Sequence, residues 1–381
     1  MEFVSLLWSI VPATTAALDT QPWLQGFLFK LIPFVVVLGL LIFFHELGHF
    51  LAAKLFGIRV ETFSFGFGPR LIGIKGKITD YRLSAIPLGG YVKMKGEGLD
   101  DQVPPEEQRY SFSHQALWKR MLIVFCGPLF NFLFALLVFF LVFFSRGQMV
   151  LTNEIGETKP NFPAYQAGLR AGDRIIEVAG KPVVSWKELP PLIRKHPNRP
   201  ISILFERGQQ RFRVEVTPVS SLVKNIFGEE SREAVIGITP AGKFVSKDLG
   251  LLESIRDATI QTWNISEMTV LSIVKLIQRK VPLDTLGGPI MIAQMAGQQA
   301  QEGWVNLIFF AALLSINLGI LNLLPIPILD GGHLLFFGLE GILRRPISIR
   351  KRELAQQVGM FILVLLMVFV FYNDILRIIQ Q

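Results

Sequence analysis

The feature that most constrains this chain is an apolar run at residues 31–55, whose first part, residues 31–42, contains no charged side chain. A helix that crosses a bilayer needs roughly 20 mostly apolar residues, so this run is long enough to cross one. Its second half nevertheless contains His45, Glu46 and His49. Ionisable groups in hydrocarbon are costly and usually mark a functional site. The run therefore predicts a transmembrane helix that contains such a site.

The spacing His45-Glu46-Leu47-Gly48-His49 is an H-E-x-x-H motif. On a helix, two histidines four residues apart lie on one face, so both imidazoles can reach the same metal ion. The carboxylate of Glu46 lies beside them and can take a proton from an attacking water. A chance match in a buried helix is the alternative, and the cost of three such residues in an apolar span disfavours it.

Composition indicates a membrane protein. Of the 381 residues, 51% are hydrophobic and 32 are Phe, which is too apolar for an ordinary soluble chain. The net charge is +8, but basic tracts interleaved with aromatic residues are missing, so no nucleic-acid partner is expected. The single cysteine, Cys126, allows neither an internal disulfide nor a Cys-based zinc site. The start lacks a basic region, so we expect an outward-facing lead-in at residues 1–30 rather than a cleaved signal peptide.

Four apolar runs predict a polytopic α-helical membrane protein, with the lipid bilayer as a partner. The expected transmembrane helices are residues 31–56, 120–145, 305–330 and 358–376. The segments at residues 57–119 and 331–357 are rich in Lys and Arg. Because basic loops tend to remain in the cytoplasm, we expect both segments there and both chain ends on the outer side.

The segment at residues 57–119 is predicted to contain a β-hairpin. An alternating stretch at residues 81–86 precedes Leu88-Gly89-Gly90-Tyr91-Val92-Lys93-Met94, which indicates short strands around a glycine turn. Irregular backbone at membrane depth is tolerated only where protein or a water-filled cavity satisfies it. Two alternatives stay open, a small membrane-associated sheet that approaches the site and an ordinary surface hairpin.

Residues 150–240 differ from the rest, because they are charged and rich in turns. They predict a helix from Ser185 to His196 with Ser185 as N-cap, and a hairpin around Arg207-Gly208. The run A-G-L-x-x-G-D-x-I-x-x-V-x-G at residues 167–180 resembles a PDZ domain, which implies an extracytoplasmic domain that binds a peptide by strand addition. The peptide groove is expected at the last strand: Val235, Ile236, Gly237 and Ile238. Residues 250–304 predict an amphipathic interfacial helix and a linker.

Two histidines do not complete a catalytic zinc site, which usually has three protein ligands and a water. The third ligand is expected in the segment Asn322-Leu323-Leu324-Pro325-Ile326-Pro327-Ile328-Leu329-Asp330-Gly331-Gly332-His333. Its prolines prevent a regular helix and leave the Asn322 amide free to face a cavity. Asp330 is expected at the depth of His45, and His333 is the rival ligand. Helix capping by Asp330 and an interfacial position for His333 are the alternatives.

The first-span H-E-x-x-H, the later N-x-x-P-x-P-x-L-D-G and the PDZ-like segment between them resemble the site-2 protease family, in its bacterial RseP-type branch. The resemblance covers residues 31–376, and residues 127–132, Gly-Pro-Leu-Phe-Asn-Phe, match the family's second-span motif. It implies Zn²⁺ as cofactor, bound by His45, His49 and Asp330, with Glu46 as catalytic base. It also implies that substrate is bound by Asn322 and by a membrane-reentrant hairpin with Gly89, Gly90 and Tyr91.

The expected function is that of an intramembrane zinc endopeptidase of the bacterial inner membrane. Its substrate is expected to be a single-span membrane protein, such as an anti-sigma factor already cut by a first protease, or a remnant signal peptide. One alternative is a membrane-anchored PDZ adaptor without catalysis, which has no need of Glu46. The other is a CaaX-type membrane zincin, which takes a nearby Glu as third ligand instead of a distant Asp.

Overall fold

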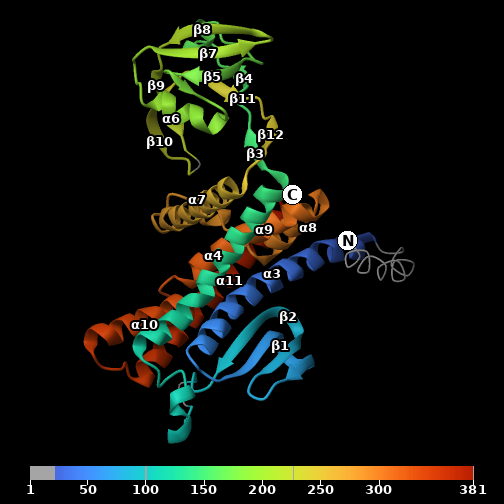
Figure 1. Cartoon of the computed structure of the whole chain (residues 1–381), viewed down its shortest axis with the longest axis vertical. Coiled ribbons are helices and arrows are strands. Elements are labelled where there is room, and N and C mark those ends of the chain that lie inside the picture. The colour runs from blue at the N-terminus through green and yellow to red at the C-terminus, as the bar shows by residue number, and fades with distance from the viewer. Residues whose placement is uncertain (1–21, 99–100, 226, 381) are drawn as a thin grey trace. The chain divides into compact units, whose positions relative to one another are not determined.

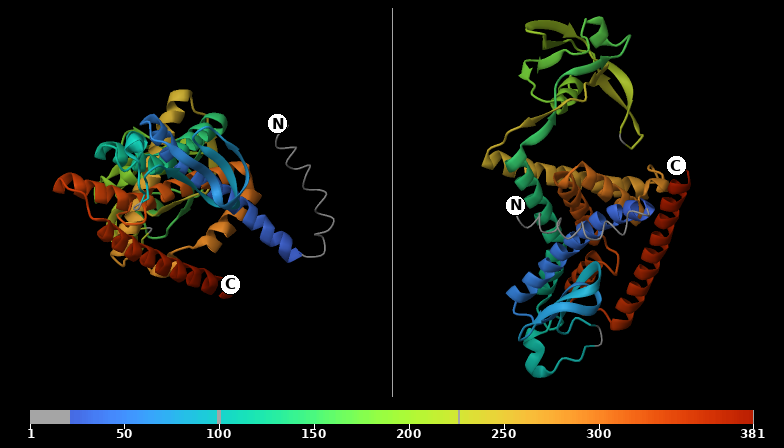
Figure 2. Two further views of the ribbon diagram at one scale, coloured as in Figure 1. Left: turned by 90° about the horizontal axis from the view of Figure 1, so that it is seen from below. Right: turned by 90° about the vertical axis from the view of Figure 1, so that its right-hand side faces the viewer.

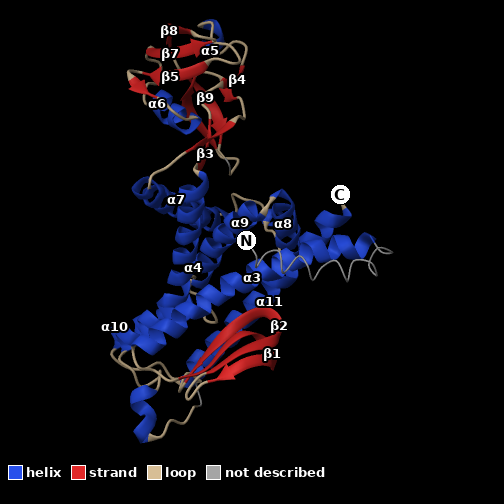
Figure 3. Cartoon of the chain, turned by 45° about the vertical axis from the view of Figure 1, so that its right-hand side comes forward, coloured by secondary structure: helices blue, strands red, loops and turns tan. Residues whose placement is uncertain are grey.

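The computed structural model describes residues 22–98, 101–225 and 227–380. The chain divides into two compact units. The first unit comprises Met1–Phe139, Ala258–Val270 and Leu283–Gln381, and the second comprises Phe140–Asp257 and Leu271–Pro282. Long helices dominate the first unit and short strands the second (Figure 3). Most of the expected lead-in at residues 1–30 lies outside the described residues, and its last part belongs to the first helix.

The four predicted spans are confirmed as helices long and apolar enough to cross a membrane. These helices are α3 (Pro22–Leu55), α4 (Leu117–Arg146), α9 (Trp304–Asn322) and α11 (Ile349–Ile379). A helix that is apolar on all sides is stable only where protein or lipid surrounds it. Of the four, α11 is the least buried by protein, which leaves most of its apolar surface for lipid.

Two helices of the first unit occupy segments where the sequence predicts none. α8 (Pro289–Glu302) lies in the segment expected as a linker, and α10 (Asp330–Leu343) lies mostly within the expected cytoplasmic loop at residues 331–357. Pro289 is tolerated at the first helical position, where its missing N–H costs nothing. Gly331 is required by packing, because a methyl group there would overlap the carbonyl oxygens of the preceding loop.

The amphipathic helix expected within residues 250–304 is α7 (Leu251–Ile277), and a short 3₁₀ turn, η3 (Leu283–Thr285), precedes α8. The C-terminal part of α11 lies against α8 (Figure 2). Asp374 of α11 accepts hydrogen bonds from the N–H groups of Gly288, Ile290 and Met291 at 2.9–3.1 Å. These N–H groups have no partner within a helix, so the carboxylate stabilises the start of α8.

The third span is shorter than expected. α9 ends at Asn322 rather than near residue 330, because Pro325 and Pro327 cannot continue a helix. The chain then turns through residues 323–329 and enters α10 at Asp330. The N-cap of α10 is Leu329, so the alternative in which Asp330 is a helix cap is wrong.

The hairpin of the first unit consists of β1 (Val60–Lys75) and β2 (Asp80–Met94), and it lies beside α3 (Figure 1). Both strands bend and pair twice. Residues 60–65 pair with residues 90–94 on one side and with residues 80–83 on the other, and residues 70–75 pair with residues 80–84. The result is a small sheet of four strand segments, in which residues 90–94 form an outer segment.

The predicted glycine pair, Gly89-Gly90, lies where β2 reverses its direction and not at the turn between β1 and β2. The hairpin turns at residues 76–79, where the Gly76 N–H donates to the Thr79 carbonyl at 2.9 Å, and both glycines lie inside β2. Gly89 has a φ of +130°, which glycine adopts without strain. A methyl group at Gly90 would lie 2.7 Å from the Ser64 carbonyl oxygen. The glycines therefore mark a bend and a close approach of two strands.

The second unit contains a four-stranded sheet in the order β6-β5-β7-β8 and three two-stranded pairs: β10 with β9, β11 with β4, and β12 with β3. The strands are β3 (Gln148–Leu151), β4 (Ile155–Thr158), β5 (Arg174–Val178), β6 (Lys181–Pro182), β7 (Ile201–Arg207), β8 (Gln210–Val216), β9 (Val219–Lys224), β10 (Glu230–Val235), β11 (Ile238–Pro240) and β12 (Phe244–Lys247). The predicted hairpin around Arg207-Gly208 is confirmed as β7 and β8. The predicted helix after Ser185 is a 3₁₀ turn, η2 (Trp186–Glu188), followed by α6 (Leu189–Arg194). A shorter helix, α5 (Pro163–Gln166), precedes β5.

The single strand expected at residues 235–238 is wrong. Val235 ends β10 and Ile238 begins β11, because Gly237 between them has a φ of +81°. A side chain at Gly237 would also overlap Phe162. All four predicted groove residues nevertheless line one cavity of 380 Å³, together with Leu189 and Ile193 of α6.

Candidate metal centre

The α3 helix places His45 and His49 one turn apart on a buried face, where they are 8% and 9% exposed. This face packs against α4, and glycine makes the close approach possible. A methyl group at Gly127 of α4 would overlap the His49 imidazole, and one at Gly48 of α3 would overlap the Cys126 carbonyl oxygen. The glycine of the second-span motif is therefore required by the two imidazoles.

α4 also orients one of the two imidazoles. His49 Nδ1 lies 2.9 Å from the Ile123 carbonyl oxygen, which accepts its proton. With the proton on Nδ1, His49 presents the lone pair of Nε2 to the centre of the site.

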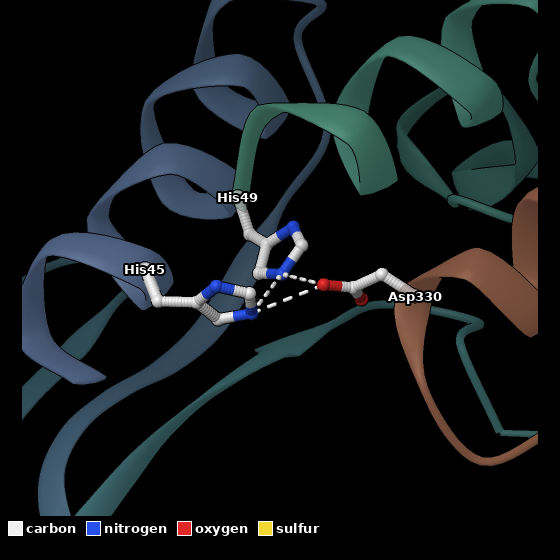
Figure 4. Close-up of side chains that lie close together, drawn as sticks. All are labelled: His45, His49 and Asp330. Carbon is white, nitrogen blue, oxygen red and sulfur yellow. Dashed lines mark hydrogen bonds and ion pairs between the residues drawn. The ribbon is translucent and has the colours of Figure 1, made fainter. Parts of the chain in front are cut away.

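Asp330 completes the group from a distant part of the chain (Figure 4). Its Oδ2 atom lies 3.0 Å from His45 Nε2 and 3.5 Å from His49 Nε2, and the two Nε2 atoms are 3.2 Å apart. Metal ions in proteins are usually held by His, Cys, Asp and Glu side chains. Among the described residues, these three side chains form the cluster of such residues that can hold a metal ion. His333 lines the adjacent cavity and does not belong to this group.

The three ligand atoms fit a zinc ion. A tetrahedral zinc with bonds of about 2.0–2.1 Å requires ligand atoms about 3.3 Å apart, close to the three separations in the site. Asp330 Oδ2 is buried and has no hydrogen-bond partner, as expected for an atom that faces a cation. Two imidazoles and one carboxylate leave one tetrahedral position for a water or substrate oxygen.

Two cavities adjoin the three side chains, one of 520 Å³ and one of 300 Å³. Both are lined by His45, Glu46 and Asp330. Glu46 is thus next to the metal position and also next to the space that a substrate can occupy. A methyl group at Gly90 would lie 3.5 Å from Glu46 Cγ, so the bend of β2 packs closely against this side chain.

The residues that the sequence implies for substrate binding line the same two cavities. Gly89, Gly90 and Asn322 line the smaller one, and Tyr91 lines the larger one. Asn322 Nδ2 lies 3.4 Å from His45 Nδ1, a long contact for a hydrogen bond.

Several side chains of the larger cavity have no signal in the sequence. Glu97 accepts the Met94 N–H at 3.0 Å, and burial raises the pKa of its carboxyl group. At the far end, Glu340 of α10 pairs with Arg120 of α4 and with Arg352 of α11. These contacts join segments far apart in the chain, so no local pattern indicates them.

A histidine pair with its glutamate on a membrane-length helix, completed by a distant aspartate, defines a membrane metalloprotease. The comparisons with known proteins agree. The model of Peptidase family M50 matches residues 33–366. The chain belongs to Peptidase family M50, the site-2 protease family, and is a membrane-bound zinc metalloendopeptidase with Zn²⁺ as its metal. The predicted enzyme class and cofactor are confirmed.

Relatives from several bacteria match almost the whole chain. A protein of Agrobacterium fabrum described as a zinc metalloprotease is 36% identical over 91% of this chain and 95% of its own length. A similarly described protein of Campylobacter jejuni is 41% identical over 91% of this chain and 93% of its own length. The regulator of sigma-E protease RseP of Salmonella typhimurium is 31% identical over 92% of this chain and 99% of its own length. Among solved structures, a PDZ domain from Listeria monocytogenes covers 23% of this chain and 84% of its own length, with 23% identity and a TM-score of 0.19.

Proposed function

We propose that this protein is an intramembrane endopeptidase that cleaves the transmembrane segment of a single-span membrane protein. The observation that supports this best is the position of the histidine pair. His45 and His49 lie within the apolar window of α3, a helix long enough to cross the bilayer. A substrate bond that reaches them must lie at membrane depth.

In the proposed mechanism, His45, His49 and Asp330 hold the zinc ion, and Glu46 is the catalytic base. A zinc ion held by these residues would supply Lewis-acid polarisation of the substrate carbonyl and of the attacking water. Glu46 takes the proton of that water and returns it to the nitrogen of the leaving amine. Glu46 lines both cavities together with His45 and Asp330, which supports this assignment.

The substrate must be unwound before it can be cleaved, because a helix hides its peptide carbonyls in i→i−4 hydrogen bonds. Residues 90–94 form an outer segment of the β1–β2 sheet, and Gly90 packs near Glu46. An extended substrate that pairs with this segment has its backbone next to the metal. We therefore assign Gly89, Gly90 and Tyr91 to substrate alignment, and Asn322, which also lines the smaller cavity, to contact with the substrate.

The proposed topology has four spans, with residues 57–119 and 331–357 in the cytoplasm of a bacterium. The second unit, with its PDZ-like segment, then lies outside the cytoplasmic membrane. The relative that is described as a regulator of sigma-E protease supports a role in regulated proteolysis, as the second cut of an anti-sigma factor or in removal of remnant signal peptides. Peptide binding at residues 235–238 is part of this proposal, and the cavity of 380 Å³ beside α6 supports it.

The experiment that tests the function compares membrane fragments in cells with the wild-type protein and with Glu46→Gln. Labelled N- and C-termini are identified by mass spectrometry. We expect new ends within apolar segments of single-span proteins, present with the wild type and missing with the variant. The Glu46-dependent cuts could instead lie near the termini of soluble or lipidated proteins. In that case the CaaX-type alternative is correct.

A further inference from the structure

Asn131 is a buried polar side chain of α4 that contacts the metal-binding group. It is 0% exposed, and its amide nitrogen lies 3.1 Å from His45 Nδ1. The mechanism proposed above assigns it no role. Asn131 contacts Nδ1 of His45, whereas Nε2 of the same ring faces Asp330. Asn131 therefore lies on the side of the imidazole away from the metal position.

The chemistry of metal binding decides which of the two groups, His45 or Asn131, donates the proton in this contact. A neutral imidazole has one protonated and one unprotonated nitrogen, and a metal takes the unprotonated one. His45 directs Nε2 toward Asp330 and His49, so its Nδ1 must carry the proton and needs an acceptor. His49 already has such an acceptor, the Ile123 carbonyl oxygen.

The missing acceptor is available in the Asn131 amide. Its Oδ1 atom is buried and has no hydrogen-bond partner, while the Nδ1 proton of His45 needs one. The oxygen and nitrogen of an amide occupy nearly equivalent positions, so a half-turn about the last side-chain bond places Oδ1 against Nδ1. We propose that Asn131 is a positioning residue that accepts the Nδ1 proton of His45 and so fixes this imidazole in the form that binds zinc.

Asn322 is the rival for this role, and two observations disfavour it. Its Nδ2 atom lies 3.4 Å and 3.5 Å from the two ring nitrogens of His45, so it contacts the ring without a clear preference. It also lines the smaller cavity, where a substrate can compete for its amide. Asn131 is buried and closer, as expected of a group that orients a ligand permanently.

The backbone of Asn131 is itself fixed by α9. The Ser315 hydroxyl donates to the Asn131 carbonyl oxygen at 2.9 Å. A methyl group at Gly319 would lie 3.3 Å from Asn131 Cβ, so the two helices are in close contact here. Asn131 therefore lies in a closely packed part of the α4–α9 interface, where the Gly319 contact remains when the Ser315 hydroxyl is removed.

The inference rests on the proposed zinc ligands, and the test distinguishes a failure of the inference from a failure of the ligand assignment. Full-length protein is purified in detergent, and zinc affinity is measured by competition with a coloured chelator. Asn131→Leu removes the acceptor, and Asn131→Asp keeps it on a carboxylate oxygen. Asn131→Ala replaces the leucine variant if that one does not fold. Ser315→Ala is the matched control, because it disturbs the α4–α9 contact without touching the imidazole.

We expect Asn131→Leu to bind zinc about 10- to 100-fold more weakly, the usual effect of losing an outer partner of a metal ligand. Asn131→Asp and Ser315→Ala are expected to stay within about threefold of the wild type, and all variants to unfold at a similar temperature without metal. Wild-type affinity in Asn131→Leu, or equal losses in the leucine and aspartate variants, would overturn the inference. His45→Ala is the reference: if it keeps zinc, the proposed ligands and this inference both fail.

Discussion

At the scale of single residues, the proposal assigns metal binding and proton transfer to different side chains. Glu46 lines both cavities and is not one of the three side chains that converge on the metal position. Glu46→Gln is therefore expected to retain zinc and to lose cleavage by about 10²–10⁴-fold, the usual cost of removing a general base. Metal content and cleavage of one reporter substrate, measured on the same preparation, check this. Activity above a tenth of the wild type would remove Glu46 from the role of base.

The choice between Asp330 and His333 gives a second prediction at this scale. Asp330 Oδ2 lies within 3.5 Å of both imidazoles, whereas His333 lines only the neighbouring cavity. We expect Asp330→Ala to lose both bound zinc and activity, and His333→Ala to keep its zinc. Elemental analysis of the two purified variants decides the question. The reverse pattern would mean that the third ligand is wrong.

The sequence predicts the local part of the site well and the distant part poorly. His45, Glu46 and His49 form a pattern within one helical turn, so they are recognisable without a structure. Asp330 emerges as a candidate from its expected depth in the membrane and from the family resemblance, beside the rival His333. Asn131 is 86 residues from His45, and its contact depends on how two helices pack, which no periodicity in the sequence describes.

At the scale of elements, the four spans follow from apolar length alone, and the short elements around the site do not. The sequence does not predict α10, whose residues fall mostly in the segment expected as a cytoplasmic loop from its basic residues and which begins with Asp330-Gly331-Gly332. Packing against the loop at residues 323–327 makes those glycines necessary within a helix. The bent strands β1 and β2 form a small sheet rather than the ordinary surface hairpin, which is the other alternative, since glycines at positive φ allow each strand to pair twice.

Glu340 of α10 joins this helix to α4 and α11, and its replacement is expected to loosen all three. The carboxylate is 6% exposed, pairs with Arg120 at 3.5 Å and with Arg352, and accepts the Ile347 N–H at 3.0 Å. Glu340→Gln leaves two partly buried guanidinium groups without their counter-charge. Breaking a buried ion pair typically costs about 3–5 kcal/mol, so we expect a lower unfolding temperature with the metal site intact.

The matched control is Glu353→Gln, which removes the same charge from a more exposed position on α11. A surface change of this kind is expected to alter stability by no more than about 0.5 kcal/mol. Thermal unfolding in detergent, followed by the fluorescence of a thiol-reactive dye at Cys126, compares the two. Equal unfolding temperatures would show that Glu340 does not join the helices.

At the scale of the whole molecule, the candidate metal centre and the proposed peptide groove belong to different units of the chain. The three metal-binding side chains, Glu46 and both adjoining cavities belong to the first unit. The groove at residues 235–238 belongs to the second. Composition change along the sequence predicts this division, because apolar runs stop at about residue 145 and begin again at about residue 305.

Replacement of residues 150–240 by a flexible linker is therefore expected to change which substrates are cut and to leave the chemistry intact. On the proposed topology, this segment lies on the opposite side of the membrane from the cytoplasmic end of α3. If it excludes bulky outer domains, the replacement allows full-length substrate to be cleaved. If it captures a newly exposed C-terminus beside Ile238, the replacement slows cleavage of the trimmed substrate. We expect exclusion, because no residue in the groove indicates a particular peptide.

The measurement compares cleavage of full-length and trimmed substrate by the wild type and the linker variant in the same membranes. A variant with an intact second unit and Ile238→Arg is the control, because it blocks the groove without removing the bulk of the domain. Exclusion predicts that only the linker variant cuts full-length substrate. Capture predicts that both variants cut trimmed substrate more slowly. Unchanged rates for both substrates in both variants would mean that the second unit does not select substrates, and selection would then have to occur at the β1–β2 sheet.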